Sequence, residues 1–139
     1  MPVSLTRVVT FHARHQYWVP AWSPEENQRR FESTSDERAH GHAYHCSVSV
    51  SGPLDPTTAM ILDLPALDAI LADEVLSLDG TELNVAVPEF ADHVEQTSCE
   101  PLAAPFLGRI ARRLPSGVTL TRVRIAEDLT LHADCTGLP

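Results

Sequence analysis

Two segments near the N-terminus alternate between apolar and polar residues. In residues 3–17 one side of the alternation ends at His15, and in residues 40–52 the corresponding side begins with His40 and His42. A period of two indicates a β-strand with one buried face, so we predict a strand in each segment. The residues on the predicted buried faces are Val9, Phe11, Ala13 and His15 in the first strand, and His40, His42, Tyr44, Cys46, Val48 and Val50 in the second.

Residues 20–39, between the two strands, break this alternation. The segment contains Pro20 and Pro24 and carries charged residues from Glu25 to Arg30. Proline and clustered polar residues interrupt regular structure, so we predict a long loop with room for a single helical turn. Loops of this length in small domains are often functional.

Two later segments show the spacing of amphipathic helices. Asp63 is suited to cap the first helix, which should end before Gly80. The second helix is predicted over residues 97–114 and is stopped by the Pro-Ser-Gly run at 115–117. The apolar residues that recur at helical spacing are Leu67, Ile70, Leu71 and Val75 in the first helix, and Phe106, Leu107, Ile110 and Leu114 in the second.

The chain finishes with two more runs of strand character, residues 118–127 and 129–135, which we predict to form a hairpin. The order strand, strand, helix, helix, strand, strand predicts an α+β fold in which both helices pack on one side of an antiparallel sheet. Because its 139 residues show no abrupt shift in composition, the chain 1–139 is expected to form a single domain.

Charge and composition narrow the range of partners. The formal net charge is −9, with 19 acidic residues against 10 basic ones, all of them arginines. Nucleic-acid binding depends on many Lys and Arg contacts with phosphates, so no nucleic-acid partner is expected. There is no long apolar run and no signal-peptide pattern, so we expect no membrane partner and a cytoplasmic location. Cys46, Cys99 and Cys135 lack C-x-x-C spacing and are expected to be reduced thiols.

The pair His40 and His42 is a candidate metal site. Residues two apart on a strand point to the same face with Cβ atoms roughly 6.5 to 7 Å apart, near enough to bind one ion. His15 can supply a third ligand if the two strands pair. Three neutral imidazoles leave a fourth zinc position open, as in catalytic sites; the alternative is half-buried histidines held by hydrogen bonds. The other histidines, treated as surface groups of which any one could carry a proton, are His12, His45, His93 and His132.

Several short motifs occur along the chain, and their order is informative. They are Phe11-His12-Ala13-Arg14-His15, Ser23-Pro24-Glu25-Glu26-Asn27 through Phe31, His40-Gly41-His42-Ala43-Tyr44, Leu54-Asp55-Pro56, Leu78-Asp79, Leu83-Asn84, Val87-Pro88-Glu89-Phe90-Ala91-Asp92 and residues 127–137. Together they resemble the 6-pyruvoyltetrahydropterin synthase and 6-carboxytetrahydropterin synthase family, and the likeness covers nearly the whole chain.

The resemblance implies a tunnelling fold and a zinc enzyme. In this fold a four-stranded antiparallel sheet with two helices on one face joins the sheets of other subunits in an oligomeric barrel. The barrel is commonly a hexamer built from two trimers, with sites between subunits. The resemblance also implies Zn²⁺ as cofactor, bound by His15, His40 and His42, and a small-molecule pterin as ligand. Family enzymes eliminate triphosphate from 7,8-dihydroneopterin triphosphate, because zinc makes hydroxyls and adjacent C–H bonds more acidic.

The resemblance also implies ring-binding residues. The family recognises the pterin ring with a glutamate near the final strands, and Glu127 matches it. A carboxylate that ends an apolar alternation needs paired donors, which the N–H edge of a pterin offers. The alternative is a strand-end glutamate that reaches solvent. Glu100 matches a second recognition glutamate, although Thr97 and Glu100 also fit a capping box for the second helix.

Two groups that transfer protons in the family are missing from this sequence. The family's base is a cysteine in the loop before the histidine pair; an alignment without gaps puts Thr34 at this position, and a shorter spacing puts Asp36 there. The family's Asp-His pair after the first helix keeps Asp79, but Gly80 replaces the histidine. None of the three cysteines maps to the base.

A carboxylate of the same loop could take over as base. A thiol titrates at about pH 8.5, whereas the alcohol of Thr34 is far too weak an acid to become a ready base. Asp36 or Glu37 could accept a proton if it is held near the metal, and some family members with an acidic residue in this loop cleave the side chain instead. The alternative is a solvated, charged loop.

Three functions therefore stay open from the sequence. The first is a zinc-dependent carbon–oxygen lyase of the pterin synthase type with altered or reduced activity, which the retained histidines and Glu127 favour. The second is a metal- and pterin-binding protein without catalysis, which the missing thiol and Gly80 favour. The third is a structural oligomeric domain whose histidines hold a structural ion.

Overall fold

Two long antiparallel strands form the centre of the sheet in the computed structural model, which describes residues 3–38 and 40–137. They are β1 (Ser4–His15) and β2 (His40–Ser51). The strands pair over their whole length, from Ser4 opposite Ser51 to His15 opposite His40. This pairing is the one that the alternating sequence pattern requires, because it brings the two apolar rows to the same face.

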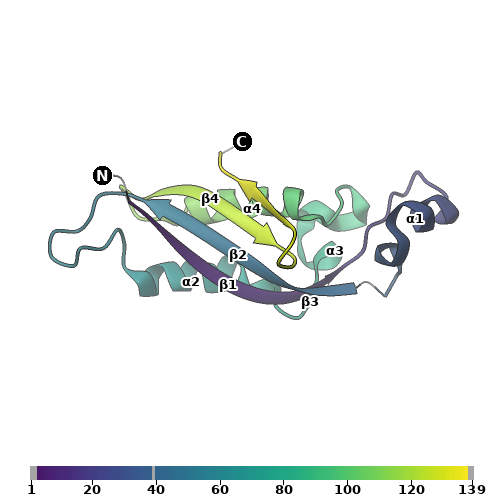
Figure 1. Ribbon diagram of the computed structural model, residues 1–139, viewed down its shortest axis with the longest axis horizontal. Coiled ribbons are helices and arrows are strands. Elements are labelled where there is room, and N and C mark those ends of the chain that lie inside the picture. The colour runs from purple at the N-terminus through teal and green to yellow at the C-terminus, as the bar shows by residue number, and fades with distance from the viewer. Residues whose placement is uncertain (1–2, 39, 138–139) are drawn as a thin grey trace.

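Two further strands extend the sheet beyond β2. β4 (Thr119–Ala126) pairs with β2, and β5 (His132–Cys135) pairs with β4 as the predicted hairpin. All of these pairings are antiparallel, so the predicted α+β fold with four antiparallel strands is confirmed (Figure 1).

A fifth strand was not predicted. β3 (Thr81–Glu82) runs parallel to β1 and lies opposite Ala13 and Arg14, which gives the strand order β3-β1-β2-β4-β5. A strand of two residues is too short to show a hydrophobic period, so no sequence pattern could predict it. In the described part of the chain, residues 4–12 of β1 have no strand on this edge.

Two helices cover one face of the sheet, as predicted (Figure 1). They are α2 (Leu64–Glu74) and α4 (Cys99–Ala111). α4 begins after and ends before the predicted limits, so that Leu114 lies beyond its end. The largest side chains buried between sheet and helices are Phe11, Tyr44, Leu67, Leu71, Leu83, Phe90, Leu102, Phe106, Leu107, Ile110 and Ile125.

The predicted caps are confirmed only in part. Asp63 is the N-cap residue of α2, as predicted, although its side chain makes no hydrogen bond to the helix, whereas the N-cap of α4 is Ser98. The hydroxyl of Thr97 donates instead to the carbonyl of Gln16 at 3.2 Å, so the capping box predicted for Thr97 and Glu100 is absent.

The prediction of a loop over residues 20–39 was wrong. Within it lie α1 (Pro24–Phe31) and a 3₁₀ turn (Glu32–Ser35), while residue 39 falls outside the described residues. Ser23 caps α1 by accepting a hydrogen bond from the Glu26 N–H at 3.1 Å. The helix is polar on most of its surface and so lacks an apolar stripe, but serine, proline and two glutamates in succession are a helix-start signal.

Short helical segments link α2 to α4. They are the 3₁₀ turn Leu76–Leu78, the helix α3 (Leu83–Ala86) and the 3₁₀ segment Pro88–His93. None of the helices in residues 3–38 and 40–137 has the length and apolar character needed to cross a membrane.

The close approach of two turns generates a prediction about stability. A Cβ atom on Gly52 would lie 2.8 Å from the carbonyl oxygen of Gly117, so one backbone segment would have to move. We expect Gly52→Ala to lower the free energy of unfolding by about 1–3 kcal/mol, measured by urea denaturation.

Gly108 in α4 provides the matched control. No heavy atom lies within 4 Å of a Cβ built at Gly108, and alanine favours a helix interior over glycine. Gly108→Ala should therefore raise the free energy of unfolding by about 0.5–1 kcal/mol. Equal effects of the two substitutions would contradict the steric argument.

Candidate metal centre

Three imidazole nitrogens converge at the end of the β1–β2 pair. The Nε2 atom of His15 lies 3.0 Å from that of His40 and 3.1 Å from that of His42, and the last two are 2.9 Å apart. The strand register produces this cluster, because His15 lies opposite His40 and Ala13 lies opposite His42. The structure thus brings together the three histidines that the sequence indicated.

Hydrogen bonds alone cannot satisfy this triangle of nitrogens. Each Nε2 atom is either an N–H donor or a lone-pair acceptor, so at least two of the three play the same role and repel each other. A cation at the centre would attract all three lone pairs. The nitrogen spacing is close to the edge of about 3.3 Å that a tetrahedron with Zn–N bonds of about 2.0 Å requires, so the donor set fits zinc.

His15 is held in the form that a metal ligand needs. Its ring is buried, and Nδ1 donates a hydrogen bond to the carbonyl oxygen of Thr97 at 2.9 Å. A proton on Nδ1 leaves the Nε2 lone pair directed at the cluster. Burial lowers the pKa of His15 to about 4, and burial followed by the neighbouring His42 also lowers the pKa of His40. Both rings are therefore neutral near pH 7.

A carboxylate lies beside the cluster. Glu127 Oε2 is 3.7 Å from His42 Nε2, and the Glu127 side chain is only 13% exposed. This oxygen is buried without a hydrogen-bond partner, as is the hydroxyl of Tyr44, whose ring centre is 5.5 Å from that of His42. Buried polar atoms usually have partners, so two unpartnered atoms next to a metal cluster indicate a place for a polar ligand.

The neighbours of Glu127 stay protonated at neutral pH. Burial, and then the nearby charge of Glu127, raises the pKa of the Tyr44 hydroxyl, which keeps it a hydrogen-bond donor. The same two causes raise the pKa of the Cys99 thiol to about 11, so this cysteine is no ready thiolate. The strand alternation placed Tyr44 on the face of His40 and His42, but no pattern indicated that Cys99 borders the site, because Cys99 reads as an ordinary core position.

The other candidates from the sequence lie outside the cluster. Among the described residues, the group of histidine, cysteine and carboxylate side chains that could hold an ion contains His15, His40 and His42 and none of the loop residues 34–37. Asp36 is tied to the Arg38 guanidinium at 3.1 Å, which together with the Arg38 backbone N–H lowers the pKa of Asp36. Glu100 is exposed in the first turn of α4.

Thr34 and Glu37 lie near the strand that carries His15. The carbonyl oxygen of Thr34 accepts a hydrogen bond from the Tyr17 N–H at 2.9 Å, and Glu37 lines a cavity of about 230 Å³ together with Gln16. The loop therefore contacts the end of β1 just beyond His15, but no contact joins these two side chains to the imidazoles.

Asp79 lies on the opposite face of the sheet from the cluster. Its Oδ1 accepts a hydrogen bond from the His12 N–H at 2.7 Å, and His12 precedes His15 by an odd number of strand positions. Side chains at such positions point to opposite faces. His12 and His132 are exposed, as predicted, whereas His45 and His93 are half-buried and contact Thr10 and Asn84.

Comparisons with known proteins identify relatives over nearly the whole chain. The sequence model of the family described as 6-pyruvoyl tetrahydropterin synthase matches residues 4–137. The chain is similar to the 6-pyruvoyl tetrahydrobiopterin synthases of Pongo abelii, with 34% identity over 124 residues, and of Homo sapiens, with 33%. Each alignment covers 88% of this chain and 83% of the relative.

A solved structure extends this likeness to the fold. The structure of Caenorhabditis elegans 6-pyruvoyl tetrahydropterin synthase is similar to this chain with a TM-score of 0.86 and 26% sequence identity. The match covers 99% of this chain and 96% of that one, so no large element is added or lost between them.

The buried His15 predicts how stability depends on pH in metal-free protein. Its pKa is about 4 in the folded protein, against an ordinary value of 6.5. Between these values the unfolded chain binds a proton that the folded chain does not, so the free energy of unfolding should fall as the pH is lowered from 6.5 to about 4. Urea denaturation at several pH values measures this slope. His15→Gln should make it shallower and His132→Gln should not; equal slopes in all three proteins would contradict the assignment.

Proposed function

Because the chain belongs to the 6-pyruvoyl tetrahydropterin synthase family, we propose that it binds Zn²⁺ and acts on a dihydropterin of the 7,8-dihydroneopterin triphosphate type. The observation that carries the proposal is the convergence of three imidazole nitrogens beside a buried, partnerless carboxylate oxygen. His15, His40 and His42 are the proposed zinc ligands. When bound, zinc would make a ligand hydroxyl and its neighbouring C–H bonds more acidic.

Glu127 has the properties of a ring-binding residue. Its buried Oε2 lacks a partner and lies within 4 Å of a proposed zinc ligand, so a ligand that reaches the metal also reaches the carboxylate. Adjacent N–H donors on one edge of a planar ring would satisfy both carboxylate oxygens. Glu100 is the second ring-binding candidate, and the absence of the capping box leaves its side chain available.

The proposed reaction is that of a carbon–oxygen lyase with altered or reduced activity. Thr34 offers no thiol, and Asp79 keeps its carboxylate while Gly80 supplies no imidazole. Within the loop, Asp36 is engaged by Arg38, which leaves Glu37 as the freer candidate for a base. Loss of a general base typically costs about 10²- to 10⁴-fold in rate, so a slower or different outcome is expected.

The second candidate function is a metal- and pterin-binding protein without catalysis. The ion pair of Asp36 favours it, because a carboxylate already paired with a guanidinium is a poor proton acceptor. Both candidates share the zinc site and the pterin pocket, and they differ only in whether the bound ligand is converted.

Binding and turnover by the zinc-loaded protein test both candidates. We expect it to bind 7,8-dihydroneopterin triphosphate in calorimetry, and we expect Glu127→Gln to weaken this binding by about 10- to 100-fold with unchanged zinc content. His42→Ala should lose zinc and pterin together. His132→Ala, which removes an exposed histidine of β5, is the control and should behave as the wild type.

The products, separated by chromatography, then distinguish the two candidates. Zinc-dependent release of triphosphate supports the lyase, whereas binding without conversion supports the non-catalytic protein. If the zinc-loaded wild type binds no pterin, the whole proposal is wrong.

The proposed assembly is a homo-oligomeric barrel, as a hexamer of two trimers. Residues 4–11 of β1 have no strand partner along one sheet edge in the described part of the chain, and an exposed edge favours pairing with another chain. Exposed apolar side chains lie on the same strand or just before it: Leu5 and Val8 are 37% and 53% exposed, and Val3, which precedes β1, is 49% exposed. A second copy would cover both the edge and these side chains.

Native mass spectrometry of the purified protein checks the assembly. We expect six chains per particle, with trimers as the first product of gentle dissociation. A particle that stays a monomer at micromolar concentration would contradict the proposed barrel.

The proposed location of the protein is the cytoplasm, and neither a nucleic acid nor a membrane is proposed as its partner. Most arginines pair with carboxylates, such as Arg7 with Asp68 and Arg124 with Asp134, each at 2.7 to 2.9 Å. Paired guanidinium groups leave little positive charge for a phosphate backbone or an anionic lipid surface.

A further inference from the structure

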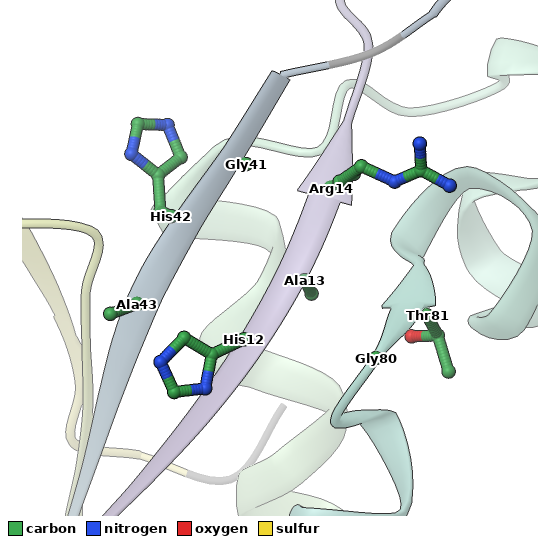
Figure 2. A pocket seen from close by; sticks show the side chains of 8 residues that line it. All are labelled: His12, Ala13, Arg14, Gly41, His42, Ala43, Gly80 and Thr81. Carbon is green, nitrogen blue, oxygen red and sulfur yellow. The ribbon is translucent and has the colours of Figure 1, made fainter.

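A cavity lies on the face of the sheet that the helices leave uncovered. It measures about 430 Å³, and its lining comes from β1, β2 and the start of β3 (Figure 2). His12 and Arg14 belong to β1, whereas Gly80 and Thr81 form the opposite side. The cavity is thus large enough for a small molecule, and two histidines line it: the proposed zinc ligand His42, and His12, which no proposed zinc site uses.

His12 is fixed to residues 79–80 by three contacts. Its N–H donates to Asp79 Oδ1 at 2.7 Å, its carbonyl accepts from the Gly80 N–H at 2.7 Å, and its ring Nδ1 lies 3.3 Å from the same Asp79 oxygen. A carboxylate that accepts from Nδ1–H keeps the Nε2 lone pair free to take a proton. A base oriented by a carboxylate is the arrangement that many enzymes use to move protons.

Gly80 keeps the space beside this imidazole open. A Cβ built on Gly80 would meet no heavy atom within 4 Å, and the residue has a φ of +78°, which favours glycine. The family's histidine would stand at this position, one residue after the retained Asp79. In this chain the imidazole nearest to Asp79 comes from β1 instead.

We propose that His12, oriented by Asp79, is the proton-transferring group of this protein and acts on a dihydropterin held by the histidine cluster of a second copy. The inference rests on the proposed function and assembly, and it supplies the base that neither Thr34 nor Gly80 can provide. His12 would be the catalytic residue, and Asp79 would be a positioning residue.

The division between two copies follows from the strand geometry. His12 points to the uncovered face, whereas His15, His40 and His42 converge on the face that carries the helices. Within one chain the imidazoles of the two groups therefore point to opposite faces of the sheet, although His42 also lines the cavity beside His12. The stretch of β1 without a partner strand ends next to His12, whose own backbone groups bond Asp79 and Gly80, so a chain that joins this edge comes next to the imidazole.

The proposed step is a reversible proton transfer. His12 Nε2 takes the proton from the hydroxyl-bearing carbon next to the pterin ring, and the electron pair of the C–H bond stays on the ligand, delocalised into the ring's C=N bond. The imidazolium formed is stabilised by Asp79 and later returns a proton to the ligand. In D₂O the returned proton is a deuteron, so deuterium uptake reports the step without any further reaction.

Deuterium uptake into 7,8-dihydroneopterin triphosphate, measured by mass spectrometry with the zinc-loaded protein in D₂O, tests the proposal. We expect His12→Gln to slow uptake by about 100-fold or more, with zinc content and pterin affinity unchanged. His45→Gln is the matched control, because His45 lies on the same uncovered face but contacts Thr10 rather than a carboxylate, and it should keep the wild-type rate.

Two further variants separate proton transfer from a structural role. Added imidazole should restore part of the uptake in His12→Gly, since the cavity can admit a free imidazole. Asp79→Asn keeps an oxygen that accepts the His12 N–H, and it should slow uptake in the wild type but not in the His12→Gln background. Independent, additive losses would overturn the assignment of Asp79 as a positioning residue.

Mixed assemblies test the division between copies. His12→Gln and His42→Ala subunits should each be inactive alone, but after joint refolding they should recover about a quarter of wild-type uptake. The reason is that random assembly joins an intact cluster to an intact His12 at one interface in four. No recovery would overturn action between copies.

The outcomes for the two proposals are distinguishable. Failure of the wild type to bind pterin defeats the proposed function. Pterin binding without deuterium uptake by the wild type, or with full uptake by His12→Gln, overturns the role of His12 and leaves the binding site intact.

Discussion

The register of β1 against β2 is the constraint on which the site depends. Phe11 lies opposite Tyr44, and their stacked rings, 5.1 Å apart, are buried under the helices. On the other face a hydrogen bond of 2.7 Å joins the hydroxyls of Thr6 and Ser49. A slip of one residue would turn the apolar side chains of one strand, and the imidazoles of that strand, toward the uncovered face. The burial that stabilises the sheet therefore also aligns the three histidines.

The two faces of the sheet therefore differ in their chemical environment. The face under the helices is apolar up to the histidine cluster, where Glu127 and the Tyr44 hydroxyl introduce the first unpartnered polar atoms. The uncovered face is polar and carries ion pairs such as Arg14 with Glu82. Low dielectric on one side keeps His15 neutral, whereas solvent on the other side leaves Asp79 ionised with its pKa lowered by His12.

The sequence predicted the elements whose residues share a period, and it missed those that lack one. Alternation located β1 and β2 and placed the three histidines on their buried faces, and the structure pairs the strands so that His15 lies opposite His40. α1 has no apolar stripe, and β3 has two residues, so neither produced a periodic signal. The predicted limits of α4 were also too wide. Local sequence preference does not show that the Thr97 hydroxyl bonds the carbonyl of Gln16 instead of capping the helix.

For the site, the sequence predicted the three clustered histidines. It did not predict the contacts that orient histidine side chains from distant parts of the chain. The three histidines come from paired strands and were found by spacing. The carbonyl of Thr97 that orients His15 is 82 residues away, and Asp79 is 67 residues from His12. Contacts across such separations depend on how α2 and α4 pack, which no local pattern encodes.

The three imidazoles project from paired strands above a packed apolar core, so strand pairing and core packing bring the proposed ligand set together. In small zinc domains the metal supplies the folding energy and its removal unfolds the chain. Here Phe106, Leu107 and the other buried residues pack α4 against the sheet. Loss of the proposed ion should therefore empty the site without unfolding the chain.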